Sequence, residues 1–120
     1  MGEIYLIKAE CLARRNEVSA AMQWIDQLLV TRYRTGTYTP MLAANREDAL
    51  QKIWTERRKE LVLRGSRWSD LKRLNREGQG INLSRTLNGT VYSLPAGDAR
   101  YVFALPVEEI EVSGLVQNER

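Results

Sequence analysis

Residues 45–75 read NREDALQKIWTERRKELVLRGSRWSDLKRLN, and their pattern predicts two consecutive helices. Asn45 is a typical N-cap residue, and two carboxylates follow it in the first turn, where the helix dipole favours negative charge. Apolar residues then recur at helical spacing up to Gly65, a residue type that commonly follows a helix end. The first helix is therefore expected to end at Arg64, and a short second helix is expected over 66–75.

Upstream of this stretch the sequence predicts two further helices, over 3–15 and 19–33. Asn16 tolerates the left-handed conformation of a helix end, so a short turn there gives an antiparallel hairpin. The pair resembles a tetratricopeptide repeat, with small, large and turn residues in that repeat's positions at Ala9, Leu12, Asn16, Ala21, Ile25 and Leu28. An ordinary helical hairpin fits the same residues, because only one repeat unit is visible.

Beyond Gly78 the sequence changes character. Asn88-Gly89 is a strong signal for a two-residue β-hairpin turn, and the run 101–105 is expected to be extended. A turn of helix is expected at 107–110, followed by an irregular tail. The predicted fold is mainly α, with antiparallel helix pairs followed by a small β-hairpin and a loop-rich C-terminal segment. We expect one domain over 1–120, with a helical part at 1–78 and an irregular part at 79–120.

Composition excludes several kinds of chemistry. The 120 residues include no histidine and one cysteine, Cys11, so Ser-His-Asp catalysis, HExxH zinc sites and CxxC sites are excluded. No pair of carboxylates has a recognisable acid/base arrangement. We therefore expect no catalytic residue, no metal, no cofactor and no enzyme activity.

Three separated blocks of residues carry a more specific resemblance. They are ExYLIxAE over 3–10, ERRKELVLRGSRWSDLKR over 56–73, and ALPVxEI over 104–110 with QN at 117–118. In this order they resemble the SusD/RagB family. That resemblance implies non-catalytic, lipid-anchored proteins on the outer face of the outer membrane. They bind oligosaccharides or other nutrients and deliver them to a SusC-like, TonB-dependent transporter. Arg64 and Glu119 depart from the family pattern, which often has Glu and Pro there.

The resemblance also implies that the chain is the C-terminal portion of such a protein. The anchoring cysteine would precede it, because Cys11 lies inside a predicted helix.

Apolar residues surround almost the whole of the helix 3–15. The sequence therefore predicts a helix face that lacks a covering layer, and either self-association through that face or marginal stability.

Aromatic residues are the candidates for a sugar-binding site. Trp24, Trp54 and Trp68 all lie on apolar helix stripes, so core packing is the favoured interpretation. Tyr38 in a loop and Tyr92 in the hairpin are the exposed alternatives for ligand binding.

Arg57 is unusual because it interrupts the apolar stripe of its helix. A buried guanidinium requires an acceptor, and Glu10 and Asp70 are the predicted partners in a structural ion pair. The basic run 57–59 also raises the possibility of a nucleic-acid binder, but flanking glutamates and a net charge of only +3 argue against it. A tetratricopeptide-type scaffold for protein interactions is the remaining alternative.

Overall fold

The computed structural model describes residues 1–120 as two compact units, Met1–Arg67 and Trp68–Arg120. Each unit is described by itself below. The mainly α fold with a small hairpin is confirmed. No helix in the structure has the length and apolar character needed to cross a membrane.

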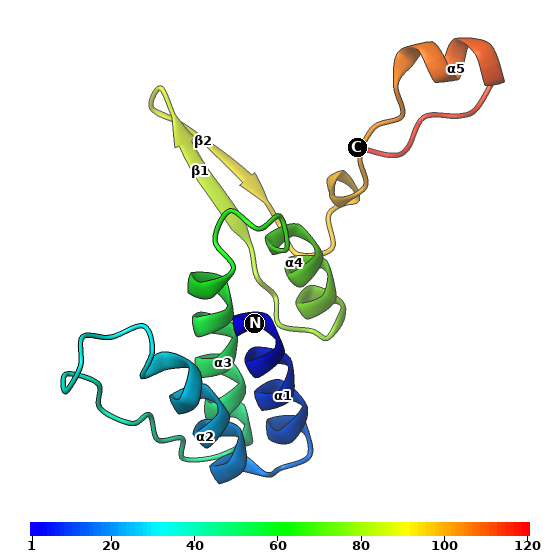
Figure 1. The fold of residues 1–120 in the computed structure, drawn as a ribbon. Helices are drawn as coiled ribbons and strands as arrows, with labels where there is room; N and C mark the ends of the chain where they lie inside the picture. The colour runs from blue at the N-terminus through cyan, green and yellow to red at the C-terminus, as the bar shows by residue number, and fades with distance from the viewer. The chain divides into compact units, whose positions relative to one another are not determined.

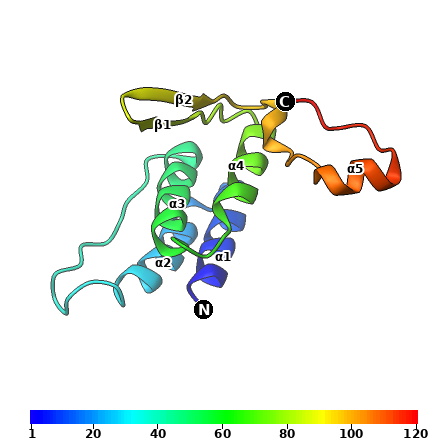
Figure 2. The same cartoon turned by 90° about the horizontal axis from the view of Figure 1, so that it is seen from above.

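Three helices form the first unit: α1 (Gly2–Arg14), α2 (Val18–Leu29) and α3 (Arg46–Glu60) (Figures 1 and 2). Asn16 has a φ of 65°, which confirms the predicted left-handed turn between α1 and α2. The amide of Asn16 donates to Ala13 O at 2.9 Å, and the amide of Glu17 donates to Leu12 O at 2.9 Å. These are the two hydrogen bonds of a Schellman motif, which satisfy carbonyls at the end of α1.

The core of this unit lies where the three helices meet. Its fully enclosed members are Leu6, Ala9, Ala13, Ala21, Ile25, Ala49 and Ile53, each 0% exposed. The burial of small residues on both α1 and α2 is what the tetratricopeptide-like pattern predicts, because small side chains allow the two backbones to approach closely.

The ends of two helices differ from the sequence predictions. α2 ends at Leu29 rather than at Tyr33, because the amides of Thr31 and Arg32 form tightened turns and Thr31 Oγ1 donates to Leu28 O at 2.7 Å. α3 ends at Glu60 rather than at Arg64, and Leu63 adopts a left-handed φ of 61° while fully exposed.

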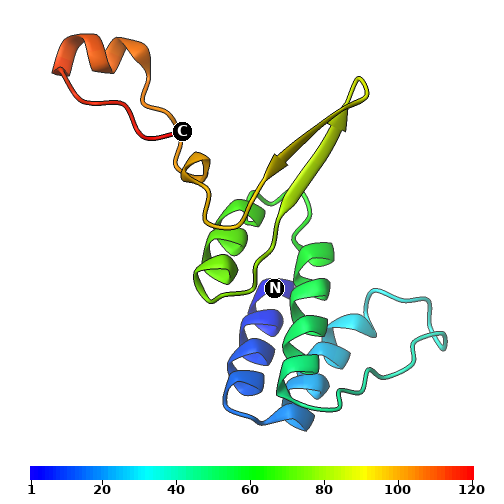
Figure 3. The same cartoon turned by 180° about the vertical axis from the view of Figure 1, so that it is seen from behind.

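The second unit contains α4 (Arg67–Arg76), whose first residue belongs to the first unit, β1 (Leu83–Leu87), β2 (Thr90–Leu94), the short 3₁₀ helix η1 (Ala99–Tyr101) and α5 (Val107–Ser113). The antiparallel strands are joined at Asn88-Gly89, both with positive φ, as predicted (Figure 3). The predicted turn of helix at 107–110 is also present and extends further, as α5. The prediction of an extended run over 101–105 is wrong at Tyr101, which is the last residue of η1. The other residues of that run, 102–105, are not helical.

The C-terminal tail is closed by two side-chain amides. Gln117 forms a pair of hydrogen bonds with the backbone of Leu105, accepting from its amide at 2.9 Å and donating to its carbonyl at 3.1 Å. Asn118 Nδ2 donates to Phe103 O at 2.7 Å. The QN pair therefore holds the segment 103–118 as a loop around α5.

Candidate functional site

The segment 30–45, between α2 and α3, forms an open hollow of about 450 Å³. It contains Tyr38, one of the two aromatic residues singled out as a ligand candidate. The lining residues are mainly aromatic, hydroxyl-bearing or apolar: Tyr33, Thr37, Tyr38, Thr39, Pro40, Met41 and Leu42. Aromatic faces beside a few polar groups are the composition of small-molecule sites in general.

Tyr38 is partly buried, which corrects the expectation of an exposed ring. Its hydroxyl donates to Asp26 Oδ1 on α2, and the amide of Met41 donates to the same oxygen at 2.9 Å. Burial, followed by the hydrogen bond to Asp26, raises the pKa of Tyr38 well above its usual range. Tyr38 therefore stays protonated and ties the loop to α2.

Tyr33 presents the accessible aromatic surface of the hollow. It is 51% exposed, and its ring lies 5.2 Å from that of Tyr38 at an angle of 52°. The sequence prediction missed Tyr33 because it placed that residue inside the helix 19–33. An interruption of the helical pattern by the β-branched pair Val30-Thr31 was the available signal.

Further hydrogen bonds fix the loop at its far end. Lys52 Nζ donates to Leu42 O at 2.8 Å, and the amide of Ala44 donates to Asp48 Oδ2 at 2.9 Å. Asn45 caps α3 as predicted, accepting from the amide of Asp48 at 2.9 Å. The hollow is thus built on a fixed loop, which reduces the entropy that a ligand would have to remove.

Tyr92, the second ligand candidate, lies on β2 in the second unit and is 59% exposed, as expected. Its partner across the hairpin is Arg85, and both strands are largely solvent-exposed. Tyr92 therefore presents a single ring on a narrow ribbon, whereas Tyr33 and Tyr38 line a hollow.

The three tryptophans are partly buried. Trp24 lies 5.4 Å from the ring of Tyr5 and packs against the core of the first unit, whereas Trp68 lies 4.9 Å from the ring of Tyr101. Trp54 has a buried Nε1 with no hydrogen-bond partner. None of the three forms part of the hollow.

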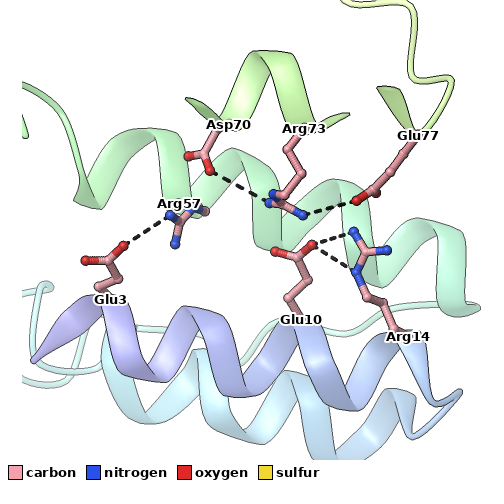
Figure 4. A network of polar contacts seen from close by, with 7 residues as sticks. All are labelled: Glu3, Glu10, Arg14, Arg57, Asp70, Arg73 and Glu77. Atoms are coloured by element: carbon pink, nitrogen blue, oxygen red, sulfur yellow. Dashed lines mark hydrogen bonds and ion pairs between the residues drawn. The ribbon is translucent and has the colours of Figure 1, made fainter. Parts of the chain in front are cut away.

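Arg57 is enclosed as the sequence suggested, with a side chain only 12% exposed. Its Nη2 donates to Glu3 Oε1 at 3.1 Å, a partner that the sequence prediction missed (Figure 4). Of the predicted partners, Glu10 accepts two hydrogen bonds from Arg14, and Asp70 lies 3.8 Å from Arg73 in the second unit. The pairing of Arg57 with Glu10 or Asp70 stays a prediction.

Residues in and beside the basic run 57–59 form ion pairs. Glu60 binds Arg32 through two hydrogen bonds of 2.7 and 2.9 Å, and Lys59 donates to the buried Glu56 at 2.6 Å. Because α3 ends at Glu60, Arg64 lies beyond the helix. No group of three or more cysteine, aspartate or glutamate side chains is placed to hold a metal ion.

A model of the SusD family matches residues 1–118. The chain belongs to the SusD family. No curated protein and no solved structure was found to match it at a significant level. SusD-family proteins bind nutrients, glycans among them, at the cell surface, and they are generally non-catalytic. Two of the family blocks have structural roles here, since Ala9 lies in the core and the QN pair closes the C-terminal loop.

Proposed function

We propose that this protein binds an oligosaccharide or another nutrient at the bacterial cell surface, without catalysis, for delivery to a SusC-like, TonB-dependent transporter. The family match over residues 1–118 is the observation that carries the proposal. The chain corresponds to the C-terminal portion of such a protein. A lipid anchor in the outer membrane is part of this proposal, and it rests on the family match alone.

Within this chain, the hollow at Tyr33 and Tyr38 is the better candidate for ligand contact, and Tyr92 is the second. A tyrosine face suits the apolar face of a sugar ring, and hydroxyls of Thr37 and Thr39 lie at the same hollow. The hydroxyl of Tyr38 already donates its hydrogen bond to Asp26. Tyr38 would therefore contribute its ring face to ligand binding and hold the loop in position.

Isothermal titration of the isolated chain against a panel of neutral oligosaccharides tests this assignment. One aromatic hollow supplies few contacts, so we expect dissociation constants no tighter than about 1 mM, roughly −4 kcal/mol. Tyr33→Ala should remove even this binding, whereas Tyr92→Ala should leave it unchanged. Micromolar binding by the isolated chain would show that the main ligand site lies within these residues.

The transporter partnership needs a separate test. Affinity purification of the full-length protein from outer membranes should recover a TonB-dependent transporter. Recovery of soluble cytoplasmic proteins instead would favour the alternative of a tetratricopeptide-type interaction scaffold.

One observation favours a self-associating surface on the isolated chain. Ile4 and Ile7 are 63% and 50% exposed, and Cys11 is exposed on the same side of α1. Residues at this spacing form one stripe along a helix. We propose that the isolated chain associates with itself through this stripe.

A further inference from the structure

A second, smaller hollow lies within the Trp68–Arg120 unit, between α4 and the turn that leads into η1. It measures about 200 Å³ and is lined by Lys72, Asn75, Arg76, Gly97, Asp98 and Tyr101. The notable property of this lining is its supply of hydrogen-bond donors. None of these residues has a role in the proposed nutrient site at Tyr33 and Tyr38.

Two cations at this hollow have no counter-ion. Lys72 and Arg76 are exposed, and neither forms an ion pair or a side-chain hydrogen bond in the structure. They stand four residues apart on α4, where like charges repel one another. This repulsion is small at exposed positions, and an anion bound between the two side chains would relieve it.

The two cations are also not needed to cap α4. The amide of Glu77 donates to Arg73 O and Leu74 O, the amide of Gly78 donates to Asn75 O, and the amide of Gln79 donates to Leu74 O. The last carbonyls of the helix are thus satisfied by backbone groups. The ammonium of Lys72 and the guanidinium of Arg76 remain available to a ligand.

Tyr101 provides a third donor, and it is buried. The residue is only 6% exposed, and its hydroxyl oxygen accepts a long hydrogen bond of 3.5 Å from Asn75 Nδ2. The hydroxyl hydrogen has no acceptor within the protein. Asn75 is held in place by two hydrogen bonds to the backbone of Ile81, at 2.7 and 2.9 Å, so the orientation of its amide is fixed.

Asp98 is the only carboxylate at this hollow, and it is already neutralised. Both of its oxygens accept from Arg100, through the backbone amide at 2.9 Å and through Nε and Nη2 at 2.8 Å each. These bonds lower the pKa of Asp98 to about 2, so Asp98 stays ionised and its negative charge is balanced by Arg100. A lining of two cations without a counter-ion, one hydroxyl donor and no unpaired carboxylate is complementary to an oxyanion.

We propose that this hollow binds an oxyanion, which, on the proposed nutrient-binding function, is the carboxylate or sulfate group of an acidic sugar. Lys72 and Arg76 would bind the anionic oxygens, and Tyr101 would donate its hydroxyl hydrogen to one of them. The volume of about 200 Å³ is small, so the site accommodates the charged group and the sugar atoms next to it rather than an extended oligosaccharide.

The test is a titration of the ¹⁵N-labelled chain followed by amide chemical shifts, with sodium glucuronate, glucose 6-sulfate and glucose at constant ionic strength. We expect saturable shifts in α4 and in residues 97–101 with at least one of the acidic sugars and none with glucose. Saturation by glucuronate alone identifies a carboxylate, and saturation by glucose 6-sulfate alone identifies a sulfate. Equal responses to glucose, or saturation by neither acidic sugar, would overturn the proposal.

Variants separate a built site from general charge attraction. Lys72→Gln and Arg76→Gln should each weaken binding at least five-fold, and Tyr101→Phe about three-fold. Arg85→Gln is the matched control, because it removes one exposed positive charge from the hairpin of the same unit and should change affinity less than two-fold. A loss for Arg85→Gln equal to that for Lys72→Gln would refute a specific site.

Discussion

Replacement of Arg57 by methionine tests how the first unit accommodates a largely enclosed charge. The side chain of Arg57 is 12% exposed, whereas that of Glu3, which accepts from its Nη2 at 3.1 Å, is 47% exposed. Methionine retains an unbranched apolar stem, so most of the packing survives and the charge is the main loss. The size of the destabilisation then depends on which carboxylate loses its partner.

The expected loss of stability depends on whether the partner of Arg57 is an exposed or a buried carboxylate. A half-exposed carboxylate such as Glu3 returns to water, and an exposed pair is worth only about 0.2–1 kcal/mol. Glu10 and Asp70 have side chains only 10% and 14% exposed, and leaving such a group unpaired costs about 3–5 kcal/mol. We expect the larger value, because a guanidinium with five N–H donors and so little access to water needs more than one acceptor.

The assay is urea unfolding followed by far-ultraviolet circular dichroism. With a slope of about 2 kcal/mol per molar urea, the expected loss lowers the midpoint by roughly 1.5–2.5 M. Double-mutant cycles with Glu3→Gln, Glu10→Gln and Asp70→Asn assign the partner, since only interacting residues give a coupling energy. Arg58→Met is the matched control on an exposed neighbour and should change stability by less than about 0.5 kcal/mol. An unchanged midpoint for Arg57→Met would refute the reasoning.

Three further predictions concern the first unit. A methyl group at Gly2 would lie 2.1 Å from Glu60 Oε1 and would displace this carboxylate from Arg32, so Gly2→Ala should lower the melting temperature. In a Glu60→Ala background the same change should raise the melting temperature, because alanine favours the helix. The hydrogen bond from Arg32 lowers the pKa of Glu60 below its usual 4.5. The stability that this ion pair contributes is therefore fully present above pH 4.5 and is lost as the pH falls through the lowered pKa. Glu60→Gln should flatten this acid limb in urea midpoints measured from pH 3 to 6. Replacing Ile4 and Ile7 together by serine should convert an associating chain to a monomer in light scattering; a monomeric parent would contradict the proposed contact stripe.

Asparagine side chains explain why much of the fold could be predicted from the sequence. Asn16 ends α1 in the left-handed conformation, Asn45 caps α3, and Asn88 starts the hairpin turn. Each of these roles depends on a side chain and the backbone within a few residues of it, so the local sequence contains the information.

The features that escaped prediction depend on contacts between distant residues. Arg32 and Glu60 are 28 residues apart, and Tyr38 reaches Asp26 across the end of α2. No local rule specifies which carboxylate a tyrosine or arginine will find once the chain is folded. The position of Tyr33 at the hollow was missed because the β-branched pair Val30-Thr31 is only a weak local signal for the end of a helix.

The Asn16 turn also has a consequence for the order of folding. Only three residues separate α1 from α2, and a loop of about ten residues closes within roughly 10–100 ns. α3 joins this pair through the longer segment 30–45, and its docking buries Ile53. Assembly from neighbouring helices is a low-contact-order route, so the first unit should refold on a microsecond-to-millisecond timescale, with the α1–α2 hairpin formed before α3 arrives.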